Sequence, residues 1–469
     1  MEKVAILTTF RGLPSGYGLV PVVLSQLNTL IKHGYEPHFY AEESFARHPD
    51  REKLPEGVKV LAKVPMVHLF DYQPGRPEQK HDVDGKGEHN PQGNRTNFAR
   101  QVEYIYEGIE PYLKNYDVII THDIVFQTWF LTHNAAIRKV AEKHPDIRWI
   151  HWLHSGPSSR PQGVKYPHVL RYSDMPNSVW ISPNETMQEK FAEMYHIPKA
   201  YIKVVYHTLS PEKFFDMHEL SVEMIEKYNL YNPEVLAVWA TRIDHPEPKG
   251  MFEVLRIIGW MNRILHRDNP EANAVMLFLN SWSNTPKAKE TMERLRKFGE
   301  DNGVPRENVL FSSEMGPQWE NGVPWKVVRD MYWIGNCFLS GSVTETFSLA
   351  TWEAALCKNM LILNEQLGVF KELAGDRAEY FKDTEEWGGI KTVTNYHPTV
   401  DAYFEEMAAK YLARLGYVQY TCEHCGKNLG MIGAYKPLMQ SRHALKYFTD
   451  DWIWENQLEP LIKGTSWRD

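Results

Sequence analysis

The sequence predicts an α/β fold of two facing Rossmann-like domains with a cleft between them. Short apolar strands alternate with amphipathic helices, and this alternation stops in a polar stretch over residues 209–232 and then starts again. The chain of 469 residues also exceeds the size of about 250–300 residues at which single cores stop growing. Repeated strand–helix units indicate parallel sheets, which bind ligands beyond the carboxyl ends of their strands.

The first domain is expected over residues 1–210. A strand in VAILTT precedes a helix over residues 19–34, in which apolar residues recur at three- and four-residue spacing up to a terminal Gly34. Further strands are expected in EPHFYAE, YDVIITHD, IRWIHWLHS and SVWISPNET. Residues 71–97 break the pattern with Gly, Pro, Asn, His and charge, and so long a loop is either functional or disordered.

The second domain is expected over residues 211–439. Its strands are predicted in VLAVWATR, AVMLFLN, NVLFSS and CFLSGS, with helices over residues 251–266 and 286–302. The final segment LKYFTDDWIWENQLEPLI carries an apolar helical stripe. It predicts a helix within residues 440–469 that packs back on the first domain.

The composition is that of a globular protein with a large core, since 43% of the residues are hydrophobic and 24% are charged. No uncharged apolar run reaches the ~18 residues of a membrane-spanning helix, and the N-terminus lacks the apolar core of a signal peptide. We therefore expect a cytoplasmic protein without a transmembrane segment. The net charge of −8 argues against a broad nucleic-acid surface but leaves a local basic groove open.

Two of the four cysteines have the spacing of half a zinc site. Cys422 and Cys425 lie in TCEHCGK, with His424 between them and His443 further on. A structural zinc site needs two more ligands at suitable spacing, and no second cysteine pair supplies them. Reduced thiols and no bound metal are therefore expected, with zinc as the alternative.

Two loops carry groups that suit a phosphate ligand. In TTFRGLPSGYGLV, Gly16 and Gly18 permit a tight turn and close backbone approach at the start of a helix. In ATRIDHPEPKG, Arg242 follows a strand and Lys249 precedes a helix, which is typical of a pyrophosphate clamp. A structural turn and a solvated basic turn are the respective alternatives.

The segment SVTETFSLATWEAALC holds two glutamates, Glu345 and Glu353, eight positions apart. Glu345 is expected in a turn after the strand CFLSGS, and Glu353 in the helix that follows. A carboxylate accepts hydrogen bonds from two adjacent hydroxyls, so one glutamate could hold a sugar and the other a ribose. Two surface glutamates are the alternative, which fits poorly because the run between them is expected to be buried.

Taken in order along the chain, these features resemble the retaining GT-B glycosyltransferases of the glycogen-synthase-like class. The resemblance rests on the Gly-rich first loop, the histidines of THD and RWIHWLHS, Ser182, the Arg242/Lys249 pair and the E-x7-E signature of Glu345 and Glu353. It implies transfer of a hexose or pentose from a nucleoside diphosphate sugar with retention at the anomeric carbon. No metal or other cofactor is then required, because the two cations neutralise the leaving diphosphate.

The resemblance also assigns roles to single residues. Glu345 and a histidine of the first domain, His151 or His154, act at the transferred sugar. His154 is preferred because HSGPSS is typical of a loop leaving the strand, whereas a histidine within an apolar strand more often belongs to the core. His122 is a candidate for acceptor binding. The donor-binding set is Gly16, Gly18, Arg242, Lys249, Thr346, Phe347, Ser348, Leu349 and Glu353.

Some positions depart from the family pattern. Thr346 and Ser348 stand where the family usually has glycine, and their side chains bear on which sugar fits the donor pocket. His207 stands where an asparagine often ends the strand before the linker. The spacing from Arg242 to Lys249 is lengthened by HPEP.

The acceptor is suggested only by a shorter similarity. RGLPSGYGLVPVVLSQLNTLIKHGYE and AEESFAR also resemble phage DNA α-glucosyltransferases, which modify hydroxymethylated cytosine. Arg160, Lys165 and Arg171, interleaved with tyrosines, would line a groove for a DNA backbone. A solvated basic patch is the alternative.

Three other functions stay open on the sequence alone. A transferase of this class could act in cell-surface polysaccharide or glycolipid synthesis, although the helix over residues 19–33 carries only Lys32 and lacks the basic face of a membrane-binding helix. A nucleotide-sugar epimerase on the same fold and a binding protein without turnover are the further alternatives.

Overall fold

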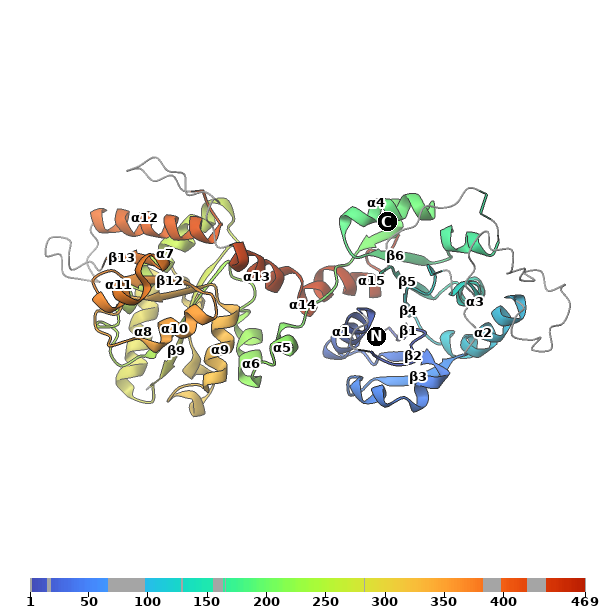
Figure 1. Ribbon diagram of the computed structural model, residues 1–469, viewed down its shortest axis with the longest axis horizontal. Coiled ribbons are helices and arrows are strands. Elements are labelled where there is room, and N and C mark those ends of the chain that lie inside the picture. Colours follow the sequence, from blue (N-terminus) through green and yellow to red (C-terminus); the bar gives the residue numbers. More distant parts are fainter. Residues whose placement is uncertain are drawn as a thin grey trace. The chain divides into compact units, whose positions relative to one another are not determined.

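The computed structural model describes residues 2–14, 18–65, 98–127, 130–154, 163–164, 166–281, 283–382, 398–419 and 436–468. The chain divides into two compact units, Met1–Ser210 together with Phe448–Asp469, and Pro211–Tyr447. In Figure 1 each unit is a sheet with helices packed on it.

The first unit is built on a sheet in which every neighbouring pair of strands is parallel. The strand order is β3-β2-β1-β4-β5-β6-β7. The strands are β1 (Val4–Leu7), β2 (His38–Glu42), β3 (Lys59–Val64), β4 (Val118–His122), β5 (Arg148–Trp152), β6 (Ser178–Ser182) and β7 (Ile202–Val204). The helices are α1 (Leu19–Lys32), α2 (Phe98–Leu113), α3 (Leu131–Lys143) and α4 (Glu185–Tyr195).

Both faces of this sheet are covered. Val4 and Ile6 of β1 belong to a core cluster with residues of α1 and of the C-terminal segment. Ala5 and Leu7 point to the opposite face and pack with residues of α2, α3 and α4. Burial on both faces explains why these strands read as continuous apolar runs rather than as alternating ones.

The C-terminal segment completes the first unit. It consists of α14 (Asp450–Ile453), a π-helical turn (Trp454–Leu458) and α15 (Glu459–Ile462). Trp454 is 1% exposed and stacks on His33 with ring centroids 4.6 Å apart. The predicted return of a C-terminal helix to the first unit is confirmed. This helical segment begins only at Asp450, because α13 (Lys436–Tyr447) ends within the second unit and Thr449, in extended conformation, separates it from α14.

The second unit is built on a parallel sheet with the order β10-β9-β8-β11-β12-β13. Its strands are β8 (Val235–Arg242), β9 (Ala274–Ser281), β10 (Val309–Phe311), β11 (Cys337–Ser340), β12 (Met360–Asn364) and β13 (Glu379–Phe381). Its helices are α5 (Pro211–Phe214), α6 (Glu219–Tyr228), α7 (Met251–Asp268), α8 (Pro286–Asp301), α9 (Trp325–Ile334), α10 (Leu349–Leu356), α11 (Gly368–Ala374), α12 (Pro398–Leu415) and α13.

The two strand orders fix where a ligand is expected in each unit. The order reverses between β1 and β4 in the first sheet and between β8 and β11 in the second. Open α/β sheets bind ligands outside the carboxyl ends of the strands at such a switch point. The prediction of two Rossmann-like α/β domains is confirmed by these parallel sheets. None of the helices in the described residues is long and apolar enough to cross a lipid bilayer.

Candidate active site

At the switch point of the second sheet, the start of α7 and the end of β11 touch through their backbones. A Cβ atom added to Gly250 would lie 2.4 Å from the carbonyl oxygen of Gly341, and one added to Gly341 would lie 2.5 Å from that of Gly250. Gly250 also has a φ of +61°, in the left-handed region. The amide of Val343 donates to the Pro248 carbonyl over 3.0 Å. Only glycine permits so close an approach at both positions.

This contact brings two predicted site residues together. The ammonium of Lys249 donates to Oε1 of Glu345, and the hydroxyl of Ser342 donates to the same oxygen over 3.1 Å. The side chains of Lys249 and Glu345 are 22% and 21% exposed, so a ligand can reach both. Within the described residues Glu345 Oε2 has no hydrogen-bond partner. The carboxylate therefore keeps one oxygen to accept hydrogen bonds from a ligand.

Arg242, the last residue of β8, is oriented by a neighbouring carboxylate. Its Nε and Nη2 donate to the two oxygens of Asp244 over 3.1 and 2.7 Å. This bidentate pair holds the pKa of Asp244 below its usual value. Because the Arg242 side chain is 53% exposed, the oriented guanidinium remains accessible to an anion.

The turn after Glu345 leads into α10 through a strained residue. Ser348, which precedes the helix, has a φ of +60°, and its hydroxyl lies 2.8 Å from that of Thr351. Glycine adopts this left-handed conformation without strain, whereas a residue with a Cβ does not. The backbone thus gives a physical reason for the glycine that the resembled family usually has at this position.

Glu353, on α10, accepts a hydrogen bond from the indole nitrogen of Trp325 over 3.1 Å. Trp325, the first residue of α9, is itself 69% exposed. Its indole therefore holds one carboxylate oxygen of Glu353 at the protein surface.

The expectation of a buried run between the two glutamates is wrong. Thr346 is exposed, and Phe347 and Leu349 are 48% and 68% exposed. The reason is the orientation of α10, which turns only Thr351 and Ala354 fully into the core. Three of the four predicted donor-binding residues over 346–349 are therefore exposed, and Ser348 is partly buried.

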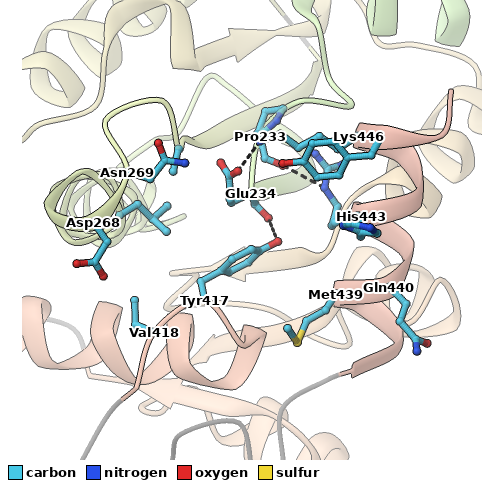
Figure 2. Close-up of a pocket in the computed structure, with 14 residues that line it drawn as sticks. Pro233, Glu234, Asp268, Asn269, Tyr417, Val418, Met439, Gln440, His443 and Lys446 are labelled. Carbon is cyan, nitrogen blue, oxygen red and sulfur yellow. Dashed lines mark hydrogen bonds and ion pairs between the residues drawn. The ribbon is translucent and has the colours of Figure 1, made fainter. Parts of the chain in front are cut away.

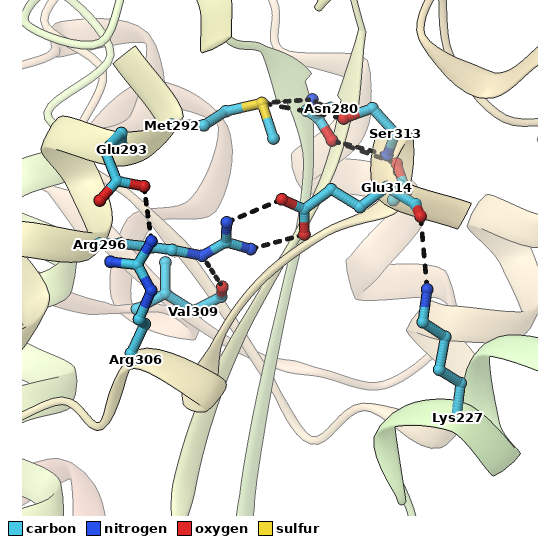
Figure 3. A network of polar contacts seen from close by, with 10 residues as sticks. Lys227, Asn280, Met292, Glu293, Arg296, Arg306, Val309, Ser313 and Glu314 are labelled. Carbon is cyan, nitrogen blue, oxygen red and sulfur yellow. Dashed lines mark hydrogen bonds and ion pairs between the residues drawn. The ribbon is translucent and has the colours of Figure 1, made fainter. Parts of the chain in front are cut away.

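A polar network supports the same sheet edge on the side of β9 and β10 (Figure 3). Buried Asn280, near the end of β9, donates from Nδ2 to the hydroxyl of Ser313 over 2.9 Å and accepts from the Ser313 amide over 3.2 Å. Beside it, Arg296 donates to both oxygens of Glu314 over 2.7 and 2.5 Å. These bonds fix the backbone that follows β10.

A cavity of about 520 Å³ lies at the opposite, amino-terminal edge of the second sheet (Figure 2). Among its charged groups, Lys446 donates to Glu234 over 2.5 Å, and the buried guanidinium of Arg442 donates to backbone carbonyls including Pro233. Glu234 precedes β8, whereas the Lys249–Glu345 pair lies beyond the carboxyl ends of the strands. The cavity is thus separate from the candidate site.

Three histidines meet at the carboxyl edge of the first sheet. His122 ends β4, His154 follows β5, and His207 follows β7. Nδ1 of His122 lies 2.8 Å from Nε2 of His154, and the rings of His154 and His207 have centroids 5.0 Å apart. Burial lowers the pKa of His122 to about 3 and also lowers the pKa values of His154 and His207. All three imidazoles are therefore neutral at pH 7.

The two predicted catalytic histidines differ in access. His151, within β5, is fully buried, with Nδ1 2.8 Å from the Thr121 hydroxyl and Nε2 3.2 Å from that of Ser178. Both of its ring nitrogens thus have hydrogen-bond partners inside the sheet, and His151 cannot contact a ligand. His154 is only partly buried. His122, 3% exposed, lies behind His154 and reaches a ligand only through it.

The structure provides less support for a ligand-binding role of the remaining predicted residues. Gly18 starts α1 with an ordinary φ of −56° and open space around it, so its position accepts other residues. The Nε of Arg171 donates to the Phe126 carbonyl over 2.6 Å, and its guanidinium stacks on the Phe126 and Tyr172 rings. Five predicted residues lie outside the described residues: Gly16, Arg160, Lys165, Cys422 and Cys425. The loop over 71–97 lies outside them too. Within the described ranges, no group of three or more His, Cys, Asp or Glu side chains is arranged to hold a metal ion.

Some contacts in the site involve residues outside the predicted set. Ser342, Trp325 and Gln26, which bonds His122 over 3.0 Å, were not predicted. The run SGS before Glu345 was the one available signal for Ser342. Gln26 lies 96 positions from His122, so no local pattern could have joined them.

No protein-family model matches this chain, and no curated protein matches it. Solved structures similar to it include a glycosyltransferase from Rickettsia africae, with 14% identity over 98% of both chains and a TM-score of 0.34. Sucrose-phosphate synthase from Thermosynechococcus elongatus has 13% identity over 99% of this chain and 100% of that one, with a TM-score of 0.30. HepE from Anabaena in complex with UDP has 12% identity over 98% and 100%, with a TM-score of 0.32.

At these TM-scores the alignments carry no weight for the function of this chain. The side chains at the two switch points bear on its function directly.

Proposed function

We propose that this protein is a glycosyltransferase that takes a sugar from a nucleoside diphosphate sugar, with the second unit as the donor-binding domain. The observation that carries the proposal is the Lys249–Glu345–Ser342 cluster at the switch point between β8 and β11. It combines a cation for phosphate with a carboxylate for hydroxyls, which are the two chemistries that such a donor presents.

The cationic half of the cluster suits the diphosphate. Arg242 is the last residue of β8, and Lys249 lies beyond it, directly before Gly250 at the amino end of the 18-residue α7. Helix amino termini favour phosphate because their backbone N–H groups and dipole point at it. In the free protein each cation is paired with a carboxylate, and donor binding would exchange these partners for phosphate oxygens.

The acidic half suits the sugar and the ribose. Glu345 keeps Oε2 for hydrogen bonds to sugar hydroxyls, and Glu353 is held at the surface by Trp325. The family resemblance assigns the same division, with Glu345 at the transferred sugar and Glu353 at the ribose. His154 is the candidate for a further hydrogen bond to the sugar, because His151 is enclosed by its neighbours.

We propose retention at the anomeric carbon. As the glycosidic bond to phosphate breaks, negative charge grows on the departing diphosphate, and Arg242 and Lys249 stabilise it. The acceptor oxygen forms its bond to the anomeric carbon on the face that the diphosphate leaves, and the departing phosphate oxygen takes the acceptor proton. In this scheme the two cations neutralise the charge of the diphosphate, and we propose that no metal ion is required.

The proposed acceptor is a hydroxyl group. A hydroxymethylated pyrimidine base of phage DNA is the first candidate from the resemblance, and a polysaccharide or glycolipid hydroxyl is the alternative. Of the three cations expected to line a DNA groove, the described residues include only Arg171, which stacks on Phe126 and Tyr172. A transfer assay with hydroxymethylated and unmodified DNA separates the two acceptor classes.

Thermal-shift screening against a panel of nucleoside diphosphate sugars tests the donor site, since a ligand that binds only the native state raises Tm. At least one donor is expected to stabilise the protein, and Glu345→Ala and Arg242→Ala are each expected to abolish that shift. Arg306→Ala is the matched control, because Arg306 is also an exposed arginine paired with a carboxylate, that of Glu293. No stabilisation by any donor would count against the proposal.

Two other functions on this fold give different results in the same experiments. A nucleotide-sugar epimerase converts the donor without any acceptor, so incubation with donor alone reveals it. A binding protein without turnover shows the thermal shift but transfers sugar to no acceptor.

A further inference from the structure

A chain of hydrogen bonds runs from α1 to the candidate sugar-contacting histidine. Oε1 of Gln26 lies 3.0 Å from Nε2 of His122, and Nδ1 of His122 lies 2.8 Å from Nε2 of His154. The centroids of the two imidazoles are 5.1 Å apart and their planes differ by 28°. This separation fits two rings joined edge to edge by one in-plane hydrogen bond.

With the amide oxygen of Gln26 facing His122 and Nε2 of Gln26 buried without a partner among the described residues, the direction of every bond in this chain is determined. An amide oxygen only accepts hydrogen bonds, so Nε2 of His122 must carry a proton and donate to it. A neutral imidazole has one donor and one acceptor nitrogen, and Nδ1 of His122 is therefore the acceptor. Nε2 of His154 must then donate to it, which leaves Nδ1 of His154 without a proton.

The surroundings hold this chain in place. Gln26 and His122 are both 3% exposed, so water does not compete for their hydrogen bonds. The backbone amide of His154 donates to Oδ1 of Asp123 over 2.8 Å, which fixes the start of the loop that carries the ring. On its other side the His154 ring lies against that of His207, with an interplanar angle of 16°.

The free end of the chain can meet a ligand. His154 is partly exposed, and its Nδ1 has no hydrogen-bond partner among the described residues. Burial also keeps both imidazoles neutral at pH 7, as the lowered pKa values of His122 and His154 indicate. An unprotonated Nδ1 has a lone pair and can therefore accept a hydrogen bond from a hydroxyl group.

We propose that Gln26 is a positioning residue that fixes the tautomer of His154 through His122. With Gln26 in place, His154 presents Nδ1 as a hydrogen-bond acceptor to a sugar hydroxyl. The choice of a sugar hydroxyl as the ligand rests on the proposed function, whereas the tautomer itself follows from the chain of bonds alone. Without Gln26, both tautomers of His122 become available, and His154 loses its preference.

Nitrogen NMR on the full-length protein labelled with 15N-histidine tests this proposal, because the shifts of the two ring nitrogens report the tautomer directly. At pH 8 the His154 signals, identified from their loss in His154→Gln, are expected to show a protonated Nε2 and a bare Nδ1. Gln26→Met removes the acceptor at similar volume and is expected to give a mixture of both tautomers. A wild-type His154 with its proton on Nδ1 would overturn the proposal.

Two further variants complete the test. Thr29→Val is the matched control, because Thr29 is buried on α1 and lines the same small cavity as Gln26 without joining the chain, and its His154 signals should match wild type. His122→Phe breaks the chain one step later and should give the same mixture as Gln26→Met, which keeps the test decisive if Gln26→Met fails to fold. An unchanged tautomer in a folded Gln26→Met or His122→Phe would overturn the proposal.

This measurement needs no substrate, so its outcome is separate from that of the donor screen. A fixed tautomer with no donor binding would leave the role of Gln26 standing and overturn only the proposed function. Donor binding together with a mixture of His154 tautomers would support the proposed function and overturn the role of Gln26.

Discussion

Lys249 and Glu345 form an ion pair although they are 96 positions apart in the sequence. Their pairing depends on the backbone contact between their neighbours Gly250 and Gly341, which leaves no room for a Cβ atom on either side. The candidate donor site is therefore assembled by two residues that have no side chains. A substitution at either glycine should separate the ion pair without changing a charged group.

The first prediction is that Gly341→Ala destabilises the second unit and weakens donor binding. The added methyl group would lie 2.5 Å from the Gly250 carbonyl oxygen, and only a backbone shift can relieve that clash. Overpacking of this kind costs about 1–3 kcal/mol in the free energy of unfolding. Denaturant titration measures the loss, and the thermal shift with donor measures the loss of binding.

Gly368→Ala is the control for this variant. Gly368 lies in α11 of the same unit, and an added Cβ there meets no atom within 4 Å. Alanine at a helical position should leave stability unchanged or raise it by roughly 0.5–1 kcal/mol. Equal effects of the two substitutions would contradict the close contact between Gly250 and Gly341.

The second prediction concerns the left-handed backbone of Ser348. Ser348→Gly and Ser348→Ala both remove the hydroxyl that lies beside Thr351, but only glycine relieves the strain of a φ of +60°. The glycine variant should therefore be more stable than the alanine variant by about 1 kcal/mol. Chemical denaturation of the two proteins side by side measures the difference. An alanine variant as stable as the glycine variant would argue against a left-handed residue here.

The strands, and the positions of several candidate site residues relative to them, could be predicted because they are local properties. Apolar runs such as VAILTT and VLAVWATR form strands that are buried on both faces. Such strands can be recognised from the sequence without knowing which strands and helices pack against them. The placement of Arg242 at the end of β8 follows from the run VLAVWATR, and that of Glu345 beyond β11 follows from the run CFLSGS.

The contacts between distant residues could not be predicted, since nothing local encodes them. Lys249 was predicted to bind phosphate together with Arg242, and its ion pair with Glu345 was not predicted. That ion pair depends on the Gly250–Gly341 contact. The apolar helix after Glu345 was expected to be buried, because composition alone does not show that α10 faces the core with only Thr351 and Ala354. The break at Thr449 was missed because the apolar stripe continues on both sides of it.

The third prediction separates two roles of Glu353. Glu353→Gln keeps an acceptor for the indole of Trp325 but removes the charge that would hold a ribose diol. Because hydrogen bonds to charged groups contribute about 1.5–3 kcal/mol, the Kd for a nucleoside diphosphate should rise about ten-fold or more. Trp325→Phe removes only the indole donor and should have a smaller effect. If the two variants bind alike, Glu353 serves the Trp325 contact and not the ligand.

The fourth prediction is that mild acid destabilises the first unit. Burial holds the pKa of His122 at about 3 and that of His133 at about 4, whereas both take up protons near 6.5 in the unfolded chain. The unfolded state therefore binds more protons as the pH falls below 6.5, and the stability present above that pH is lost on the way down to the folded pKa values. Between pH 7.5 and 5.5 each such histidine should reduce the free energy of unfolding by about 1.4 kcal/mol.

His133→Gln isolates one of these contributions. His133 lies on α3, is 5% exposed, and takes part in neither hydrogen bond of the chain that ends at His154, so its loss should leave that chain intact. Denaturant titrations at pH 7.5 and 5.5 should show a smaller acid-induced loss in the variant, by about 1.4 kcal/mol. This window also stays above the usual pKa of carboxyl groups, about 4, so the difference reports histidine alone. An acid-induced loss as large in the variant as in the wild type would mean that His133 is not held neutral by burial.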